Sequence, residues 1–323
     1  MNFQNAFSPR RQLGRTGFVA SRLGLGDIAD RAIAKDKLVA TLRRGLDAGL
    51  NLVDTAPGYE NGYSEEIVGE TLRQHGRRDS IFLIDKIDHL EQNVAAQMDA
   101  SLRSLGQEYV DCFVLHGLST MAKWEDVLAA GGVLDQLEQC EEAGKLHFVG
   151  ISSHDPEVLY AALHSGRMDV VMFAVGAHCD SRYIREILPL ARDHGVGTIG
   201  FKVFGAGKLL GDTSGYNQPL DVESLPMSVK DRTKNKSTRT NPGEPLLPCL
   251  TVAQCLNYTL TCDPDVALLG MSTPAEQDAA FVAALAFDAP LSGEELTKLE
   301  AAAAEAVANK GPIWWDPTPA VTA

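Results

Sequence analysis

The chain has 323 residues and a formal net charge of −14, with 43 acidic residues against 29 basic ones. This charge argues against a nucleic-acid partner, and no apolar run reaches the 18 residues that would predict a transmembrane helix. The first residues lack the apolar core of a signal peptide, and no two of the six cysteines form a C-x-x-C pair. We therefore expect a cytoplasmic protein with reduced cysteines, without a membrane partner and without a structural metal.

Short apolar runs alternate with longer helical patterns from residue 23 onward. Several runs are nearly continuous in Val, Ile, Leu and Phe, which is typical of strands buried on both faces. The predicted strands are Leu23–Gly26, Asn51–Val53, Ser80–Ile84, Tyr109–Leu115, Leu146–Ile151, Asp169–Phe173, Gly197–Phe201 and Asp265–Leu269. The predicted helices are Lys35–Ala48, Ser64–His75, Gln92–Ser104, Val133–Ala143, Pro156–Leu163, Ser181–His194, Val252–Thr261, Pro274–Leu285 and Gly293–Ala308.

Strand and helix alternate eight times, which favours a parallel (β/α)8 barrel, the TIM barrel, over a sandwich of sheets. An open doubly wound sheet alternates in the same way, but no G-x-G-x-x-G fingerprint follows the first strand. Upstream, Gln12–Leu13 and Phe18–Ala20 flank residues 14–17, which predicts a β-hairpin with a short turn. We find neither an internal repeat nor a second domain, and therefore interpret residues 1–323 as one barrel domain.

One segment, residues 212–248, breaks the alternation. It is polar, rich in Gly, Pro, Asn, Ser and Thr, and has no clear period. A loop of this length in a compact domain is usually functional or disordered. Because it follows the seventh strand, we expect it to emerge at the carboxyl ends of the barrel strands.

Polar residues follow three neighbouring strands at the point where each apolar run ends. Asp54 ends the second run, with Tyr59 in the loop beyond it. Lys86 follows the third run and His116 follows the fourth. The carboxyl ends of barrel strands meet at one face, where barrel enzymes carry their chemistry.

Each of these residues also has an ordinary interpretation when it is considered alone. The aspartate can cap a turn, the lysine can extend its charge to the surface, and the histidine can belong to the rim. A metal site made by Asp54 and His116 is a further alternative, although the chain has no H-x-H or H-E-x-x-H pattern.

The sequence resembles the aldo-keto reductases from about Gln12 to about Ala308. The resemblance is carried by residues 13–26 (LGRTGFVASRLGLG), 54–59 (DTAPGY), 64–73 (SEEIVGETLR), 101–116 (SLRSLGQEYVDCFVLH) and 144–154 (GKLHFVGISSH). It implies that the hairpin caps the bottom of the barrel. It also implies reduction of an aldehyde or ketone by NAD(P)H, or the reverse oxidation, by a tetrad of Asp54, Tyr59, Lys86 and His116. A sugar, a short aldehyde and a pyridoxal-like aldehyde all remain open as substrates.

The side-chain types of the tetrad suit proton transfer. Lys86 would lower the pKa of the Tyr59 phenol from its ordinary value of about 10, and Asp54 would hold Lys86 charged. His116 would orient the substrate carbonyl, and Tyr59 would protonate its oxygen as a general acid.

The hydride must come from a nicotinamide cofactor, because the tetrad moves only protons. By resemblance, Ser152 and Ser153 would hold the carboxamide, and the nicotinamide ring would stack on Phe201. The pyrophosphate would lie over Lys202, Phe204, Gly205, Ala206 and Gly207. The adenosine phosphate would bind Gly270, Ser272, Thr273 and Gln277. We expect NADP from the habit of the family, with NAD as the alternative.

The chain departs from the family pattern at several positions, which indicates a divergent bacterial-type member. Met172 replaces a frequent glutamine, Met271 replaces a basic residue that often marks NADP preference, and Ala280 and Phe281 replace residues that hold adenine. The basic stretch 230–239 is either a lid over the cofactor or a solvated loop. Trp314 and Trp315 either line the substrate mouth or pack the tail. The alternative function is a cofactor-binding regulatory subunit, like the potassium-channel β-subunits.

Overall fold

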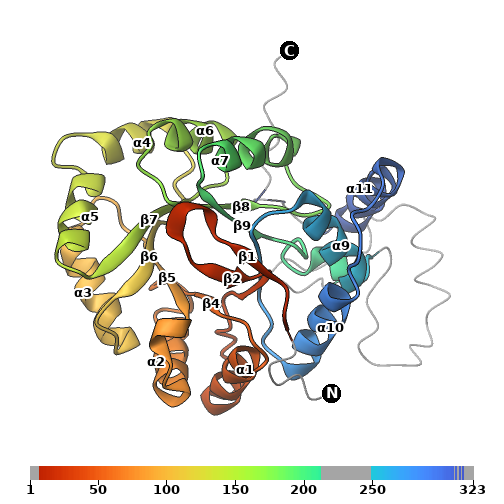
Figure 1. Ribbon diagram of the computed structural model, residues 1–323, viewed down its shortest axis with the longest axis horizontal. Helices are drawn as coiled ribbons and strands as arrows, with labels where there is room; N and C mark the ends of the chain where they lie inside the picture. The colour runs from red at the N-terminus through yellow and green to blue at the C-terminus, as the bar shows by residue number, and fades with distance from the viewer. Residues whose placement is uncertain (1–6, 212–248, 309, 311–312, 314, 316–323) are drawn as a thin grey trace.

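The computed structural model describes residues 7–211, 249–308, 310, 313 and 315, and its strands form a closed parallel barrel (Figure 1). The order around the barrel is β10-β3-β4-β5-β6-β7-β8-β9. The barrel strands are β3 (Leu23–Leu25), β4 (Leu52–Asp54), β5 (Phe82–Ile87), β6 (Val110–Leu115), β7 (Leu146–Ser152), β8 (Val170–Ala174), β9 (Gly197–Phe201) and β10 (Val266–Leu269). The prediction of a TIM barrel is therefore confirmed.

Helices surround the barrel (Figure 1). They are α1 (Lys35–Asp47), α2 (Tyr63–His75), α3 (Val94–Leu105), α4 (Met121–Leu128), α5 (Val133–Glu142), α6 (Pro156–His164), α7 (Leu188–Asp193), α9 (Val252–Cys262), α10 (Pro274–Leu285) and α11 (Gly293–Val307). The sequence did not predict α4, because its eight residues bury only Trp124 and Val127 and show no extended period. The predicted helix Ser181–His194 begins with a π-helical turn, η3 (Tyr183–Ile187), before α7. No helix among the described residues is long and apolar enough to cross a membrane.

Alternate residues of each strand point into the barrel and fill its interior. This inner cluster is apolar and includes Leu52, Phe82, Ile84, Cys112, Val114, Val170, Met172, Ile199, Val266 and Leu268. The intervening residues, such as Leu83 and Phe113, belong to the separate cluster that also contains buried helix residues. The period of two along a strand therefore decides which side chains can reach the mouth of the barrel.

The N-terminal hairpin closes the opposite end, where the amino ends of the strands meet. Its strands are β1 (Arg10–Gln12) and β2 (Val19–Ser21), joined by the 3₁₀ turn η1 (Gly14–Thr16), and it crosses the barrel in Figure 1. Leu13 and Ala20 complete the inner cluster. At Gly14 (φ +47°) a Cβ would lie 2.2 Å from the backbone nitrogen of Gly197, so only glycine fits this contact.

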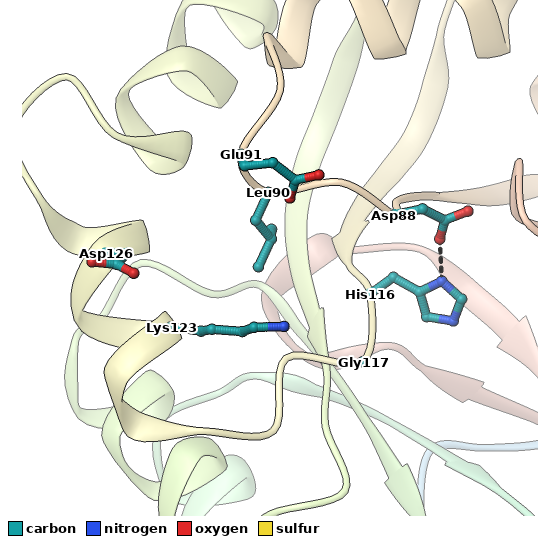
Figure 2. A pocket seen from close by; sticks show the side chains of 7 residues that line it. All are labelled: Asp88, Leu90, Glu91, His116, Gly117, Lys123 and Asp126. Carbon is teal, nitrogen blue, oxygen red and sulfur yellow. Dashed lines mark hydrogen bonds and ion pairs between the residues drawn. The ribbon is translucent and has the colours of Figure 1, made fainter.

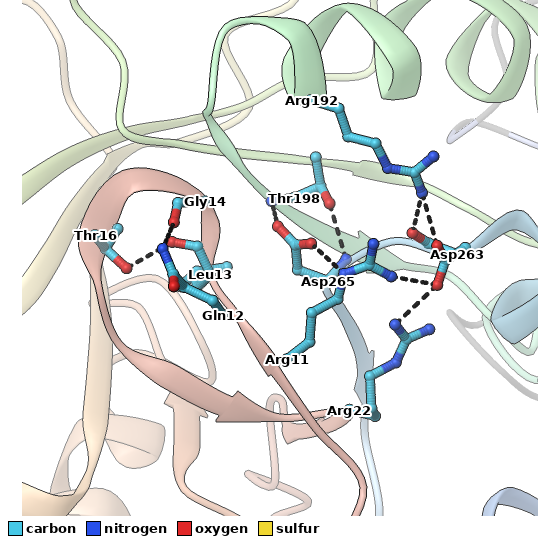
Figure 3. Close-up of polar contacts among 10 residues, drawn as sticks. All are labelled: Arg11, Gln12, Leu13, Gly14, Thr16, Arg22, Arg192, Thr198, Asp263 and Asp265. Atoms are coloured by element: carbon cyan, nitrogen blue, oxygen red, sulfur yellow. Dashed lines mark hydrogen bonds and ion pairs between the residues drawn. The ribbon is translucent and has the colours of Figure 1, made fainter.

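Asp263 joins the hairpin to the barrel through three arginines (Figure 3). Its carboxylate accepts hydrogen bonds from Arg11 in the hairpin, from Arg22 at 2.8 Å and from Arg192 of α7 at 3.0 Å. Burial would raise the pKa of Asp263, but the hydrogen bonds from Arg11 and Arg22 outweigh it and lower the pKa. Beside it, Asp265 accepts a hydrogen bond from the Thr198 amide at 2.9 Å.

We expect Asp263→Asn to lower the free energy of unfolding at pH 7 by about 1 kcal/mol, because charge-assisted bonds are lost from a partly exposed site. A carboxyl group whose pKa is lowered by folding stabilises the protein above its unfolded pKa, and this contribution disappears as pH falls through the folded pKa. Denaturant titration should therefore show a difference between wild type and variant at pH 7 that shrinks below about pH 4. Asp193→Asn, at an exposed position of α7, is the control. A difference that stays constant with pH would contradict the ionic role of Asp263.

Candidate active site

A cavity of about 690 Å³ opens at the carboxyl ends of the strands. Residues from most of the barrel strands and from the loops that follow them form its wall. The predicted site residues that line it are Asp54, Tyr59, Lys86, His116, Ser152, Phe201, Lys202, Phe204, Ala206, Gly207, Gly270 and Ser272. Met172 lines it as well, with a thioether in place of the amide that the resemblance would supply.

The period of two explains why residues from distant parts of the sequence meet here. Asp54 lies two residues beyond Leu52, which points inward, and Lys86 lies two beyond Ile84. The same spacing relates His116 to Val114 on β6. Each polar residue is thus the next inward position after the apolar interior ends.

Lys86 and Asp54 form a buried ion pair. The Lys86 Nζ donates to Asp54 Oδ1 at 2.6 Å and to the Thr55 carbonyl oxygen at 2.7 Å. The exposed fractions of the lysine and aspartate are 1% and 2%. Burial by itself would lower the pKa of Lys86, but Asp54 and Tyr59 outweigh it and raise the pKa. Lys86 therefore stays an ammonium inside the protein.

Tyr59 lies against this ammonium, with the Lys86 Nζ 4.5 Å from the centre of its ring. The sequence predicted that Lys86 would lower the pKa of the phenol. In the structure burial raises the pKa of Tyr59 well above its ordinary value, and Lys86 only partly opposes this rise. Desolvation of the phenolate outweighs the attraction of the lysine, because the phenol group is buried although Tyr59 as a whole is partly exposed in the wall of the cavity.

His116 has a charged partner that sequence reasoning missed. Its Nδ1 forms a short hydrogen bond with Asp88 Oδ1, and its ring meets Tyr59 edge-on at 5.6 Å between centroids. Asp88 and His116 also line a smaller pocket of about 210 Å³, together with Lys123 of α4 (Figure 2). Asp88 lies two residues beyond Lys86, so the strand period would have been a signal for it. Asp54 and His116 thus have partners other than each other.

Four predicted cofactor residues do not line the cavity: Ser153, Gly205, Thr273 and Gln277. Ser153 is buried, and its hydroxyl donates to the Asp155 carbonyl oxygen. Thr273 caps α10, and Gln277 is fully buried with its amide donating to the Thr41 carbonyl oxygen at 2.8 Å. Side-chain contact between Gln277 and a ligand in the cavity would require this amide to move.

The turn after β9 exposes its backbone to the cavity. Lys202, Gly205, Ala206 and Gly207 all have left-handed conformations, with φ of +59°, +53°, +53° and +85°. The Gly205 amide donates to the Lys202 carbonyl oxygen at 2.8 Å, which tightens the turn. A succession of such conformations is typical of backbone turns that bind anions.

Three titratable residues in the cavity wall were not predicted: Asp27, Glu60 and His154. Burial, with a smaller contribution from Asp54, raises the pKa of Asp27 to about 6. Burial lowers the pKa of His154 to about 4, and its ring meets Phe201 edge-on at 5.3 Å. Asp27 and Glu60 were missed because each lies in a loop beyond its strand, whereas His154 lies two residues beyond Ser152, so the strand period would have been a signal for it.

The described part of the C-terminal tail packs against the barrel. Trp315 is fully buried, and its indole N–H donates to the His178 carbonyl oxygen at 3.2 Å. This favours packing over a place in the substrate mouth for Trp315. Trp314 and the loop 212–248, with its basic stretch 230–239, lie outside the described residues.

A buried pair of acidic residues lies behind Lys86. Asp85 and Glu65 are 0% and 4% exposed, and Asp85 Oδ1 accepts a hydrogen bond from the Lys86 backbone amide. Burial, followed by the charge of Glu65, raises the pKa of Asp85 well above its ordinary value. Among the described residues neither Asp85 Oδ2 nor Glu65 Oε1 has a hydrogen-bond partner, and a single proton shared between the two carboxyl groups would supply the donor that two carboxylates lack.

We expect Asp85→Asn to stabilise the protein at pH 8 by about 1 kcal/mol, because the amide is a permanent donor at this position. The raised pKa means that the folded chain holds its proton more tightly than the unfolded chain. The free energy of unfolding should therefore fall as pH rises from about 4 through the folded pKa, and less so in the variant. Denaturant titrations at pH 5 and pH 8 measure how the free energy of unfolding changes with pH in wild type and in the variant. Asp36→Asn, exposed on α1, is the control. An Asp85→Asn variant with the wild-type slope would contradict the shared proton.

Comparison with known proteins agrees with this geometry. The model of the aldo/keto reductase family matches residues 22–303. The chain therefore belongs to the aldo/keto reductase family.

The relatives of this chain include bacterial reductases. The NADH-specific methylglyoxal reductase of Escherichia coli is 28% identical over 215 residues, which cover 57% of this chain and 64% of that protein. Aldo-keto reductase YhdN of Bacillus subtilis is 28% identical over 218 residues, 61% of this chain and 62% of the relative. Each alignment thus spans less than two thirds of the relative.

The same barrel occurs in the holo form of aldo-keto reductase AKR11C1 from Bacillus halodurans. Its TM-score is 0.65 at 24% identity, covering 91% of this chain and 96% of that one. An aldo/keto reductase from Klebsiella pneumoniae in complex with NADP and acetate has a TM-score of 0.64 at 21% identity, covering 91% and 95%. These likenesses show the fold.

Proposed function

We propose that the protein reduces an aldehyde or ketone with NAD(P)H, or oxidises the corresponding alcohol, with Tyr59 as the general acid or base. The observation that carries this proposal is the meeting of Tyr59, Lys86, Asp54 and His116 in one cavity. Membership of the aldo/keto reductase family supports the reaction class. The free state of all six cysteines supports a reducing compartment, the cytoplasm.

The rest of the cavity wall fits a nicotinamide cofactor, which when bound supplies the hydride. Phe201 offers a flat ring, and the Ser152 hydroxyl can bond the carboxamide. The left-handed turn through Ala206 and Gly207 leaves backbone available to the pyrophosphate. At Gly270 an added Cβ would lie 3.2 Å from the Asp27 carbonyl oxygen, a tight contact with backbone that a glycine avoids.

The family relatives use both forms of the cofactor. One is named for NADH, and one solved structure contains NADP. Met271 is fully buried and provides no charge for a 2′-phosphate. We keep NADP as the first expectation and NAD as the second.

The raised pKa of Tyr59 has a direct chemical consequence. The phenol keeps its proton at neutral pH, so the proton is present for transfer to a carbonyl oxygen, although the raised pKa makes the phenol a weaker acid. When the proton leaves, the adjacent Lys86 ammonium stabilises the phenolate that forms. Asp54 holds that ammonium at the required place.

We expect Tyr59→Phe to lower kcat for carbonyl reduction at least ~100-fold, because the proton donor is lost. The Kd for NADPH and NADH, measured by fluorescence titration, should change less than about twofold, since the ring remains. Turnover is measured with a panel of aldehydes and ketones. Tyr63→Phe is the control, because it removes a nearby phenol outside the cavity.

The outcomes separate the two candidate functions. Nucleotide binding without any turnover by wild type would support the regulatory alternative. Turnover that survives in Tyr59→Phe would contradict the role of Tyr59, and absence of nucleotide binding would overturn the whole proposal.

We also propose that Asp27 disfavours anionic substrates. Its carboxyl group faces the cavity and becomes charged as pH rises through about 6. Glu60 faces the same cavity, but Arg31 lies 3.4 Å from its carboxylate and offsets its charge.

The ratio of kcat/KM for glyoxylate, an anion, to that for glyceraldehyde, a neutral aldehyde, should fall about fivefold between pH 5 and pH 7.5. Asp27→Asn should remove most of this pH dependence, because the added negative charge is no longer formed. Glu60→Gln is the control and should keep it. Equal pH dependence in wild type and Asp27→Asn would show that Asp27 does not select by charge.

A further inference from the structure

Asp88 connects two segments that bear on the proposed reaction. One carboxylate oxygen bonds to Nδ1 of His116, and the other accepts a hydrogen bond from the Gly58 amide at 2.5 Å. Gly58 directly precedes Tyr59. Figure 2 shows the His116 Nδ1 turned to Asp88 and the ring directed away from Lys123. One side chain at the end of β5 therefore holds both His116 and the loop that carries Tyr59.

The close approach at Gly58 shows that this contact is built into the backbone. A Cβ at residue 58 would lie 2.6 Å from Asp88 Oδ2, far inside a normal contact distance. Asp88 and His116 are 15% and 28% exposed in their side chains, so water competes only weakly for their bond. Both oxygens of Asp88 are thus committed to partners in the protein.

The partners of Asp88 decide where the proton of His116 lies. Burial would raise the pKa of Asp88, but the hydrogen bond and charge of His116, and the Gly58 amide, outweigh it and lower the pKa. Asp88 is therefore a carboxylate, which can only accept hydrogen bonds. Its bond with His116 requires a hydrogen on Nδ1, which fixes the tautomer of the neutral ring.

We propose that Asp88 is a positioning residue that fixes His116 as the Nδ1–H tautomer, so that Nε2 donates a hydrogen bond only when the ring is an imidazolium. This inference rests on the proposed carbonyl reduction. The neutral ring presents a lone pair at Nε2, which repels the lone pairs of a carbonyl oxygen. The imidazolium instead donates to that oxygen and stabilises its developing negative charge, while the proton itself comes from Tyr59.

Three of the titratable groups around His116, namely Tyr59, His154 and Lys86, keep their charge states near neutral pH. The pKa of Tyr59 is raised and that of His154 lowered to about 4, so both are neutral, and Lys86 remains charged beside Asp54. The groups on the remaining sides are Asp27 in the cavity and Glu91, Lys123 and Asp126 in the smaller pocket. Of these, Asp27 titrates at about pH 6. A pH dependence of reduction that changes when Asp88 is replaced therefore reports on His116.

Asp88→Asn should reverse the tautomer. The Gly58 amide still requires an acceptor, so the Asn oxygen should bond to it and the Asn NH₂ group should donate to Nδ1. The ring hydrogen then moves to Nε2, which becomes a donor without a charge. The matched control is Asp126→Asn, which removes a carboxylate from the same small pocket without touching His116.

Nitrogen-15 NMR of histidine-labelled protein tests this directly, with His116→Gln to assign the signal. At pH 9 we expect wild type and Asp126→Asn to show a protonated Nδ1 and an unprotonated Nε2, and Asp88→Asn to show the reverse. A protonated Nε2 in neutral wild type, or the same tautomer in Asp88→Asn, would overturn the proposal. If Asp88→Asn does not fold, Gly58→Ala displaces the carboxylate instead, and an unchanged tautomer in that variant would overturn it equally.

Kinetics provide the second readout. Once His116 has lost its charge, wild-type kcat/KM for reduction of a neutral aldehyde should fall about tenfold per pH unit. In Asp88→Asn the fall over the same pH range should shrink to less than about twofold per pH unit. Identical profiles in the two proteins would contradict the inference. The NMR result does not depend on turnover, so inactivity of the wild type would remove the proposed function and leave the tautomer testable.

Discussion

The buried ammonium of Lys86 is the group around which the open end of the barrel is built. A charge that is 1% exposed is very costly unless its donors are satisfied. Asp54 and the Thr55 carbonyl oxygen accept its hydrogen bonds, and the ring of Tyr59 lies over it. The same contacts that make the ion tolerable inside the protein place an acid, a base and a phenol next to one another. In this region stability and the proposed chemistry depend on the same atoms.

Four aspartates near this lysine differ in protonation because their surroundings differ. Asp54 is paired with the ammonium itself. Asp85, the residue before Lys86, points to the other side of the strand, where burial and then the charge of Glu65 raise its pKa. Asp88 is kept ionised by His116, and Asp27 titrates into the cavity near pH 6. The residue type is constant, so burial and the nearest partner determine the charge of each.

In the proposed reaction, the site would bind an anionic cofactor and release a proton within the same cavity. The turn after β9 would present its backbone and Lys202 to the cofactor, and Tyr59 would supply the proton. Asp88 links His116 to the loop that carries Tyr59, because it bonds both His116 Nδ1 and the Gly58 amide. At the other end of the barrel, Asp263 ties the hairpin to the barrel through its three arginines (Figure 3).

The fold could be predicted from the sequence because it depends on short-range patterns. Apolar runs and helical periods mark where strands begin and end, and the alternation along β5 already implies that Lys86 points inward and Asp85 outward. Asp54, Tyr59, Lys86 and His116 could be chosen for the same reason, since each is the polar residue that ends an apolar run or follows it closely. The short helix α4 was missed because two buried residues give no period.

Only the tertiary structure decided the distances between side chains that come from different elements. The bond from Asp88 to His116 joins residues 28 positions apart, and the pair of Asp85 with Glu65 joins a strand to a helix. The sequence shows both residues of each pair but not their contact. The burial that raises the pKa of Tyr59 is likewise invisible in the sequence, which led to the opposite prediction for its phenol. The sequence by itself determined which side chains point into the barrel, because that follows from the period of a strand. Their protonation was decided by packing, because desolvation and the nearest charge depend on atoms that only the closed barrel brings together.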